Sequence, residues 1–172
     1  MSEAAQPMIV AVMGVTGSGK TTVGSLLAKR LGWEYADADD FHSPENKDKM
    51  HRGIPLTDAD RLPWLAAIHD YLVRAESEHR NLVLACSALK QSYRQLLFHG
   101  VAVRLVYLKG TYELIDERLR MRKGHFADDK ILAAQFADLE EPTDAVVVDI
   151  HPDPERIVDE ICRRLNPSPA TT

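Results

Sequence analysis

The sequence predicts an α/β protein in which helices cover both faces of a parallel β-sheet. Four short, almost continuously apolar runs, at residues 8–13, 82–86, 101–108 and 145–150, have the length and composition of strands buried on both faces. Helical patterns separate these runs, and alternating strands and helices are typical of parallel sheets. The 172 residues suit a single domain, 1–172, with a core of ordinary size.

The remaining elements follow the same alternation. A shorter fifth strand is expected at residues 33–36, and helices are expected at 20–31, 61–78, 88–98, 112–121, 130–139 and 154–165. Ser87 is expected to cap the helix at 88–98, and residues 57–60 resemble a capping box. The highly charged residues 118–129 are expected to form a mobile lid, and residues 166–172 a frayed tail.

Composition excludes several classes of partner. The formal charge of -5 provides no strong basic field, so no nucleic acid partner is expected. Cys86 and Cys162 lie in different segments and are expected to be reduced core residues rather than metal ligands. The first seven residues lack the pattern of a signal peptide, and no apolar run reaches the roughly 18 residues that span a bilayer. A cytoplasmic protein without a membrane partner is therefore expected.

Residues 14–21, GVTGSGKT, fit the phosphate-binding pattern of a glycine, four residues, and Gly-Lys-Ser/Thr between a strand and a helix. The glycines let backbone N–H groups wrap a phosphate at the positive end of the helix. Lys20 can reach the β- and γ-phosphates, and the Thr21 hydroxyl can bind Mg²⁺. The residues expected to bind ATP here are Gly14, Val15, Thr16, Gly17, Ser18, Gly19, Lys20, Thr21 and Thr22.

An acidic cluster follows the second strand, and the carboxyl ends of parallel strands share one edge of a sheet. A phosphoryl-transfer enzyme needs a carboxylate to orient or deprotonate the attacking hydroxyl, which is the role expected of Asp39. Asp37 is expected to hold Mg²⁺ through water. Asp40 has no assigned role. The alternative is a solvated acidic loop.

Cations in three later segments are candidates for anion binding. Arg61 lies in a first helical turn, where a cation opposes the helix dipole, so an anionic partner such as a substrate carboxylate is expected. Lys90 and Arg94 are four residues apart and are expected to share a helical face at the same crevice. Arg118 and Arg122 are expected to contact ATP, with Arg122 neutralising the transferring group. The alternative in each case is an ordinary solvated cation.

Taken together, these segments resemble the thermoresistant-type gluconokinases, a branch of the small P-loop kinases related to shikimate kinases and similar to nucleoside monophosphate kinases. The resemblance covers nearly the whole chain. Beyond the P-loop it rests on residues 37–42, 53–65, 86–94, 107–110, 122–126 and 135–142. Shikimate kinases would be expected to have three glycines after the third strand, where this chain has Cys86, Ser87 and Ala88.

The resemblance implies a P-loop NTPase fold with five parallel strands in the order 2-3-1-4-5, a lid at 118–129 and a homodimer. It implies ATP with Mg²⁺ as donor and D-gluconate as acceptor, which gives 6-phosphogluconate and ADP. It supports Asp39 on the acceptor side and residues 122–125 as lid, and it places His42 and His125 with the substrate-binding residues.

Two other functions remain open from the residues themselves. Another small-molecule kinase, acting on shikimate or a nucleoside monophosphate, would share every catalytic part and differ in the acceptor pocket. A nucleotide-binding switch or RNA-binding protein would use the same loop but turn over poorly without a partner. The acidic balance disfavours RNA.

Overall fold

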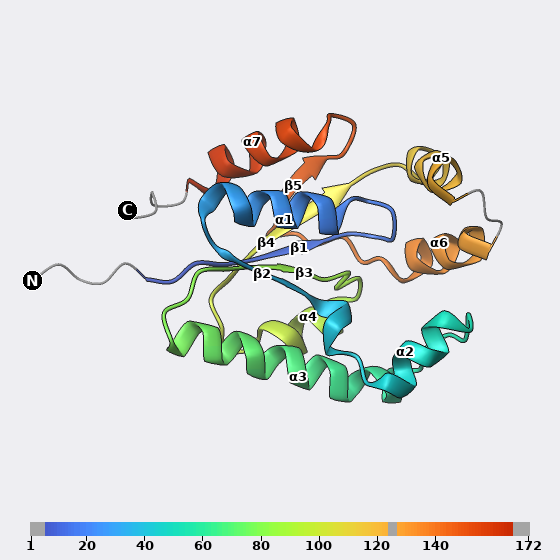
Figure 1. Cartoon of the computed structure of the whole chain (residues 1–172), viewed down its shortest axis with the longest axis horizontal. Coiled ribbons are helices and arrows are strands. Elements are labelled where there is room, and N and C mark those ends of the chain that lie inside the picture. The colour runs from blue at the N-terminus through green and yellow to red at the C-terminus, as the bar shows by residue number, and fades with distance from the viewer. Residues whose placement is uncertain (1–5, 124–126, 167–172) are drawn as a thin grey trace, which may run out of the picture.

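The computed structural model describes residues 6–123 and 127–166. Five strands form one sheet in the order β2-β3-β1-β4-β5, which confirms the predicted order (Figure 1). The strands are β1 (Ile9–Met13), β2 (Glu34–Asp37), β3 (Leu82–Ala85), β4 (Val103–Lys109) and β5 (Val146–Asp149). Every neighbouring pair is parallel, so all five carboxyl ends lie at the same edge.

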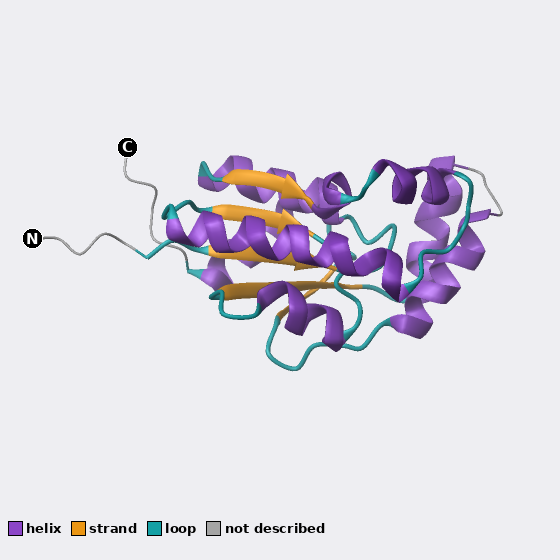
Figure 2. Cartoon of the chain, turned by 90° about the horizontal axis from the view of Figure 1, so that it is seen from below, coloured by secondary structure: helices purple, strands orange, loops and turns teal. Residues whose placement is uncertain are grey.

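Helices cover the sheet on both faces. They are α1 (Lys20–Leu31), the 3₁₀ helix η1 (Ala38–Phe41), α2 (Pro44–His51), α3 (Asp58–Ser77), α4 (Gln91–Phe98), α5 (Tyr112–Lys123), α6 (Ala127–Asp138) and α7 (Pro154–Leu165). The pair α1 and α7 packs on one face, and the pair α3 and α4 packs on the other (Figures 1 and 2). The helices α2, α5 and α6 lie beyond the carboxyl edge of the strands (Figure 1).

The central strand β1 explains why its sequence is apolar at every position. Side chains of a strand alternate between the two faces of a sheet. Val10 and Val12 pack in the core beneath α1 and α7, whereas Ile9 and Met13 pack in the core beneath α3 and α4. All five residues of β1 are buried, which confirms the interpretation of this run as a strand covered on both sides.

Several predicted boundaries are confirmed, and others are wrong. The capping box at Thr57 and Asp60 is present, although α3 starts at Asp58 rather than at residue 61. The expectation that Ser87 caps a helix is wrong, because α4 starts at Gln91. Ala88 has a φ of 46°, in the left-handed region, so the backbone after β3 cannot continue directly into a helix.

Two helices, η1 and α2, are not predicted from the sequence. The helix α2 is polar, so apolar periodicity does not reveal it. Its start does carry a signal, because Ser43 accepts a hydrogen bond from the Asn46 N–H and Pro44 occupies the first helical position. Helix α5 ends later than predicted and α6 begins earlier, so both lie partly within residues 118–129, the predicted lid.

Cys86 is buried and Cys162 is half-buried, and both are free thiols, as predicted. Of the helices within the two described ranges, none has the length and apolar character needed to cross a bilayer.

Candidate active site

The glycine-rich loop between β1 and α1 has the shape of a phosphate cradle. Gly17 and Gly19 have φ values of 77° and 97°, a region that other residues rarely adopt. A Cβ atom on Gly14 would lie 2.5 Å from the Oγ of Ser18, so only glycine allows the loop to close over that buried hydroxyl. The loop thus presents backbone N–H groups at the positive end of α1, as binding of an anion requires.

Lys20 and Thr21 open α1 directly after the cradle. The Nζ of Lys20 donates a hydrogen bond to the carbonyl oxygen of Val15 at 3.0 Å, so the side chain folds back over the loop. Burial lowers the pKa of Lys20, and the charges of Asp39 and Asp37 oppose that shift. Thr22 lies exposed in the first turn of α1.

Asp37 connects the cradle to the acidic turn. Its Oδ2 atom accepts hydrogen bonds from Thr21 Oγ1 and from the Tyr35 hydroxyl, both at 3.3 Å. Its Oδ1 atom accepts the N–H of Asp39 at 2.9 Å and so caps η1. The Thr21 hydroxyl, which is predicted to bind Mg²⁺, and the Asp37 carboxylate, which is predicted to hold a metal-bound water, therefore lie together.

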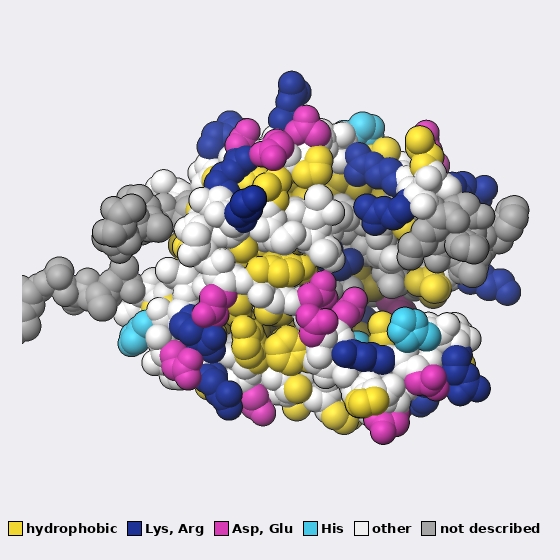
Figure 3. Space-filling view, in the orientation of Figure 1, with side chains coloured by type: hydrophobic (Ala, Val, Ile, Leu, Met, Phe, Trp, Pro, Cys, Tyr) yellow, Lys and Arg dark blue, Asp and Glu magenta, His cyan; other side chains and the backbone are white. Residues whose placement is uncertain are grey.

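The surroundings of Asp39 favour the neutral form of its carboxyl group. Partial removal from water raises its pKa above the ordinary value, and the carboxylates of Asp37 and Asp40 add to that shift, while Lys20 opposes it. A carboxylate with a raised pKa is a stronger proton acceptor. Acidic side chains gather at the surface over the position of η1 (Figure 3).

His42 closes the acidic turn and connects it to α3. Its ring stacks on that of Trp64, with centroids 4.3 Å apart, and Trp64 Nε1 donates to the carbonyl oxygen of Ala38 at 2.7 Å. The Nδ1 atom of His42 is buried without a partner among the described residues. Burial, with a contribution from the Arg61 charge, lowers the pKa of His42 to about 4, so the ring is neutral at pH 7.

Two of the predicted cations, Arg61 and Lys90, lie together around Tyr93, a residue that has no predicted role. The guanidinium of Arg61 and the ammonium of Lys90 lie 5.6 and 5.3 Å from the ring centroid of Tyr93. Arg61 Nη1 also donates to the Tyr93 hydroxyl at 2.9 Å, and that hydroxyl donates to Asp58 Oδ1 at 2.5 Å. These four residues, the Tyr93 cluster, come from the starts of α3 and α4.

Arg94 does not share a face with Lys90, because Lys90 precedes α4 while the Arg94 side chain is buried. Its Nη1 atom donates to the carbonyl oxygens of Ala88 and Leu89, at 2.7 and 3.0 Å, and its Nη2 atom donates to that of Glu140 at 2.8 Å. Arg94 therefore holds the segment after β3 against the segment after α6. The role of Arg94 in holding a substrate carboxylate stays a prediction, and this geometry favours Arg61 for it.

The predicted lid residues are partly within the described chain. Arg118 and Arg122 both lie on α5, four residues apart, and therefore on one side of it. Arg118 donates to the carbonyl oxygen of Ile150 at 2.7 Å, beside the end of β5, whereas Arg122 is exposed. His125 lies outside the described residues.

Gln135 is a further residue of the site, and the sequence alone assigns it no role. Its side-chain Oε1 accepts the backbone N–H of Thr16, inside the cradle, at 2.6 Å. The two residues are 119 positions apart, so no local pattern could have paired them. This hydrogen bond ties α6 to the phosphate-binding loop.

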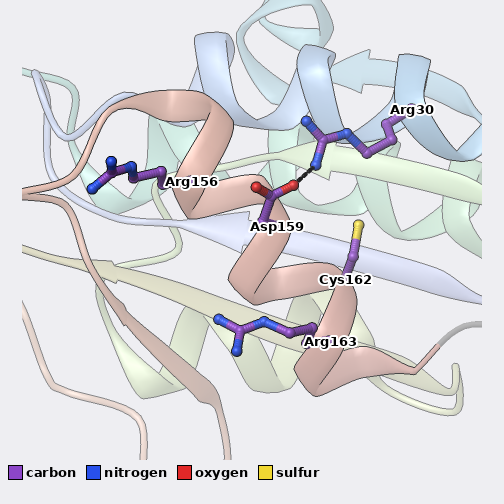
Figure 4. A pocket seen from close by; sticks show the side chains of 5 residues that line it. All are labelled: Arg30, Arg156, Asp159, Cys162 and Arg163. Carbon is purple, nitrogen blue, oxygen red and sulfur yellow. Dashed lines mark hydrogen bonds and ion pairs between the residues drawn. The ribbon is translucent and has the colours of Figure 1, made fainter.

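A shallow cavity of about 680 Å³ lies elsewhere, between α1 and α7, and is lined by Arg30, Arg156, Asp159, Cys162 and Arg163 (Figure 4). Arg30 stands in the last turn of α1, at the opposite end from the cradle, and forms ion pairs with Glu155 and Asp159. These pairs join the two helices and contribute no group to the candidate site.

The oxygen atoms at the mouth of the cradle suit Mg²⁺. In the part of the chain that the structure describes, no three His, Cys, Asp or Glu residues could enclose a metal by themselves. Mg²⁺ in phosphoryl transfer takes few protein ligands and completes its shell with water and phosphate oxygens. The Thr21 hydroxyl and the Asp37 carboxylate are hard oxygen donors 3.3 Å apart and fit that requirement.

Comparison with known proteins agrees with this geometry. The family model described as shikimate kinase matches residues 16–166. A probable gluconokinase from Mus musculus is 46% identical over 155 residues, which cover 80% of this chain and 84% of that protein. The thermoresistant gluconokinase of Escherichia coli (strain K12) is 42% identical over 155 residues, covering 87% of this chain and 89% of that protein.

A solved structure of a gluconokinase has the same fold as this chain. The crystal structure of a gluconokinase from Sinorhizobium meliloti 1021 superimposes with a TM-score of 0.83 and 39% sequence identity. The match covers 95% of this chain and 94% of that one, so the two share the sheet and its surrounding helices.

Proposed function

The chain belongs to the gluconokinase family of P-loop kinases, and on that premise we propose that it transfers the γ-phosphoryl group of ATP to D-gluconate, giving 6-phospho-D-gluconate and ADP. The observation that carries the proposal is the position of Asp39, whose carboxyl group shares the mouth of the cradle with Lys20 and Asp37. A base beside a phosphate-binding loop is the arrangement that phosphoryl transfer to a hydroxyl requires.

Each residue has a distinct task in this reaction. The backbone of the cradle holds the β- and γ-phosphates, and Lys20 stabilises the charge that develops between them. Asp39 orients the acceptor hydroxyl and accepts its proton as the new bond to phosphorus forms. Arg122, on α5, neutralises the transferring group when the lid closes, and closure excludes water that would otherwise hydrolyse ATP.

Thr21 and Asp37 would hold Mg²⁺, Thr21 directly and Asp37 through a water molecule. When bound, Mg²⁺ neutralises the charge of the phosphates. The Oδ1 atom of Asp37 caps η1, so the residue that positions Asp39 is also the one that would hold the metal-bound water.

The acceptor's carboxylate is held by Arg61 together with Lys90, and His42 lines the same pocket. An acidic chain that binds an anion beside ATP needs local cations to overcome repulsion. Arg61 and Lys90 are half-buried at the starts of α3 and α4, where a desolvated guanidinium can form two hydrogen bonds to a carboxylate.

An acceptor panel tests this function. ADP release is measured with gluconate, with the corresponding uncharged sugar alcohol, with shikimate and with nucleoside monophosphates. We expect gluconate to be preferred over the sugar alcohol by about 2–4 kcal/mol in transition-state stabilisation, the value of a desolvated charge pair. Equal use of both acceptors contradicts a carboxylate-binding site. Preference for shikimate or a nucleotide identifies another small-molecule kinase, and tight nucleotide binding without turnover identifies a switch protein.

We propose in addition that the chain is a cytoplasmic homodimer. Leu62 and Val73 on α3 and Leu96 on α4 are large apolar side chains that remain exposed on the same pair of packed helices. Light scattering during size-exclusion chromatography tests the dimer, and Val73→Glu is expected to shift the population toward the monomer.

A further inference from the structure

Three donor groups converge on one oxygen atom of Asp58. The Tyr93 hydroxyl donates to Oδ1 at 2.5 Å, Arg61 Nη1 lies 3.8 Å from it, and Lys90 Nζ lies 4.0 Å from it. A guanidinium, an ammonium and a phenol around a single carboxylate oxygen are the groups with which a protein binds a carboxylate ligand.

Asp58 is not needed to start α3. The cap of that helix is supplied by Thr57 and Asp60, which exchange side-chain and backbone hydrogen bonds at 3.0 and 3.1 Å. The side chain of Asp58 is 73% exposed, whereas those of Arg61 and Lys90 are 27% and 30% exposed. The carboxylate therefore occupies the open side of a half-buried cationic site and can leave it by a change of rotamer.

The Tyr93 cluster adjoins the acceptor side of the active site. Trp64 lies one turn after Arg61 on α3. Its indole N–H donates to the carbonyl oxygen of Ala38, and its ring stacks on that of His42. Ala38 and His42 belong to the same short segment as Asp39. Burial lowers the pKa of His42, and the charge of Arg61 adds to that shift.

We propose that Asp58 occupies the carboxylate subsite of the acceptor pocket when the pocket is empty, and that the sugar acid displaces it on binding. The inference rests on the proposed function and adds a residue that sets the affinity of the site for its acceptor. An internal competitor lowers the apparent affinity of every anion in proportion to the time that it occupies the site. The ratio of affinities between anions is unchanged, but an anion that binds through its carboxylate alone then needs a higher concentration to fill the site than an acceptor with further contacts to its hydroxyl groups.

The test is the Asp58→Asn variant, which removes the competing charge and keeps the side-chain shape. We expect the KM for gluconate to fall about 3- to 10-fold, the factor by which a mostly occupied site is freed. The kcat and the KM for ATP should stay within about twofold of wild type, since Asp58 contacts neither reacting group in this scheme. Asp58→Glu, which restores the charge, should return the KM for gluconate toward the wild-type value.

Asp70→Asn is the matched control. Asp70 is exposed on the same helix, α3, and its replacement changes the net charge by the same amount. Its KM for gluconate should equal that of wild type. Asp58→Ala provides a second variant, and titration of gluconate by calorimetry without nucleotide measures the affinity independently of turnover.

The outcomes separate the inference from the function on which it rests. If wild type phosphorylates gluconate and both Asp58→Asn and Asp58→Ala have an unchanged or higher KM for it, then Asp58 is not a competitor and the inference is overturned alone. If wild type does not phosphorylate gluconate, the proposed function fails and the inference fails with it.

Discussion

At the scale of single residues, the active site places like charges close together. Asp37, Asp39 and Asp40 belong to one short turn, and partial burial together with the charges of its two neighbours raises the pKa of Asp39. Burial and repulsion destabilise the ionised carboxylate of Asp39, which is unfavourable for folding. The same two effects make the carboxylate a better base for proton transfer. The same turn carries His42, which is buried in its neutral form.

The variant Asp39→Asn should separate these two consequences. We expect kcat to fall by about 10²- to 10⁴-fold, the usual contribution of a positioned base, while an ATP analogue still binds. Because the folded state disfavours the ionised form of Asp39, its charge costs stability at pH 7, and the variant should have a higher Tm there. That gain should vanish as the pH falls below the ordinary Asp pKa of 3.8. Unaltered turnover would move the role of base to Asp37 or Asp40.

His42 should make stability depend on pH in the mildly acidic range. Its pKa is about 4 in the folded protein against 6.5 for a free side chain. The unfolded state therefore takes up a proton first as the pH falls, and stability is lost between about 6.5 and 4, by about 3 kcal/mol in total. His42→Phe keeps the stacking on Trp64 and removes the titration. Urea unfolding at pH 7.5 and pH 5 measures the difference, and an equal loss in both proteins refutes the assignment.

At the scale of elements, the loops at the carboxyl edge are held by side chains from distant segments. Gln135 ties α6 to the cradle, and Arg94 ties the segment after β3 to the segment after α6. The backbone N–H of Glu140 also donates to the carbonyl oxygen of Leu89 at 2.9 Å. The end of α6 is thus connected to both the nucleotide side and the acceptor side of the site.

Gln135→Leu removes the side-chain acceptor of the Thr16 N–H. We expect the KM for ATP to rise about 2- to 12-fold, the equivalent of one ordinary hydrogen bond, because the cradle is then less well ordered before the nucleotide binds. The KM for gluconate should change less. Gln95→Leu, at an exposed position of α4, is the control. Equal effects on the two KM values would argue for a general loss of stability instead.

Arg94→Met should destabilise the fold. The side chain is buried, and the carbonyl oxygens of Ala88 and Glu140 lose the donor that it supplies, whereas that of Leu89 keeps the N–H of Glu140. The free energy of unfolding should therefore fall by on the order of 3 kcal/mol. Arg104→Met, at an exposed position of β4, should have little effect. Chemical denaturation measures both. If Arg94→Met instead leaves stability intact and raises only the KM for gluconate, then Arg94 holds the substrate rather than the loops.

At the scale of the whole molecule, one sheet separates two cores. The core beneath α1 and α7 supports the cradle, and the core beneath α3 and α4 supports the acidic turn and the Tyr93 cluster. Donor and acceptor sides of the site are therefore carried by opposite faces of the sheet and meet at its carboxyl edge.

Ligands that bridge the two sides should stabilise the whole fold. A nonhydrolysable ATP analogue with Mg²⁺ at about 100 times its dissociation constant should add about 2.7 kcal/mol to the free energy of unfolding. Addition of EDTA should remove most of that increment, because Thr21 and Asp37 then hold no ion against the phosphates. Thermal unfolding measures both steps. An increment that is insensitive to EDTA contradicts the assignment of these two residues to the metal.

Elements whose causes are local can be predicted from the sequence. The apolar run of β1, the glycine pattern of the cradle and the capping box at Thr57 all depend on residues within a few positions of one another. Alternation of strands and helices predicts the parallel sheet, and the family resemblance predicts the order of its strands. Asp37 and Thr21 were paired from the rule that ligands gather at the carboxyl edge of a parallel sheet.

Contacts between polar side chains from distant segments depend on the fold and cannot be predicted from the sequence. The sequence offered Arg61, Lys90 and Arg94 as three similar cations, but folding buries Arg94 against carbonyl oxygens and turns the other two toward Tyr93 and Asp58. The helix predicted at residues 88–98 starts instead at Gln91, after Ala88 with its positive φ, and the carbonyl oxygen of Ala88 accepts a hydrogen bond from the buried Arg94. Hydrogen bonds between segments many residues apart have no periodic signature, since any donor in a sequence has many possible acceptors and only the fold brings one of them within reach.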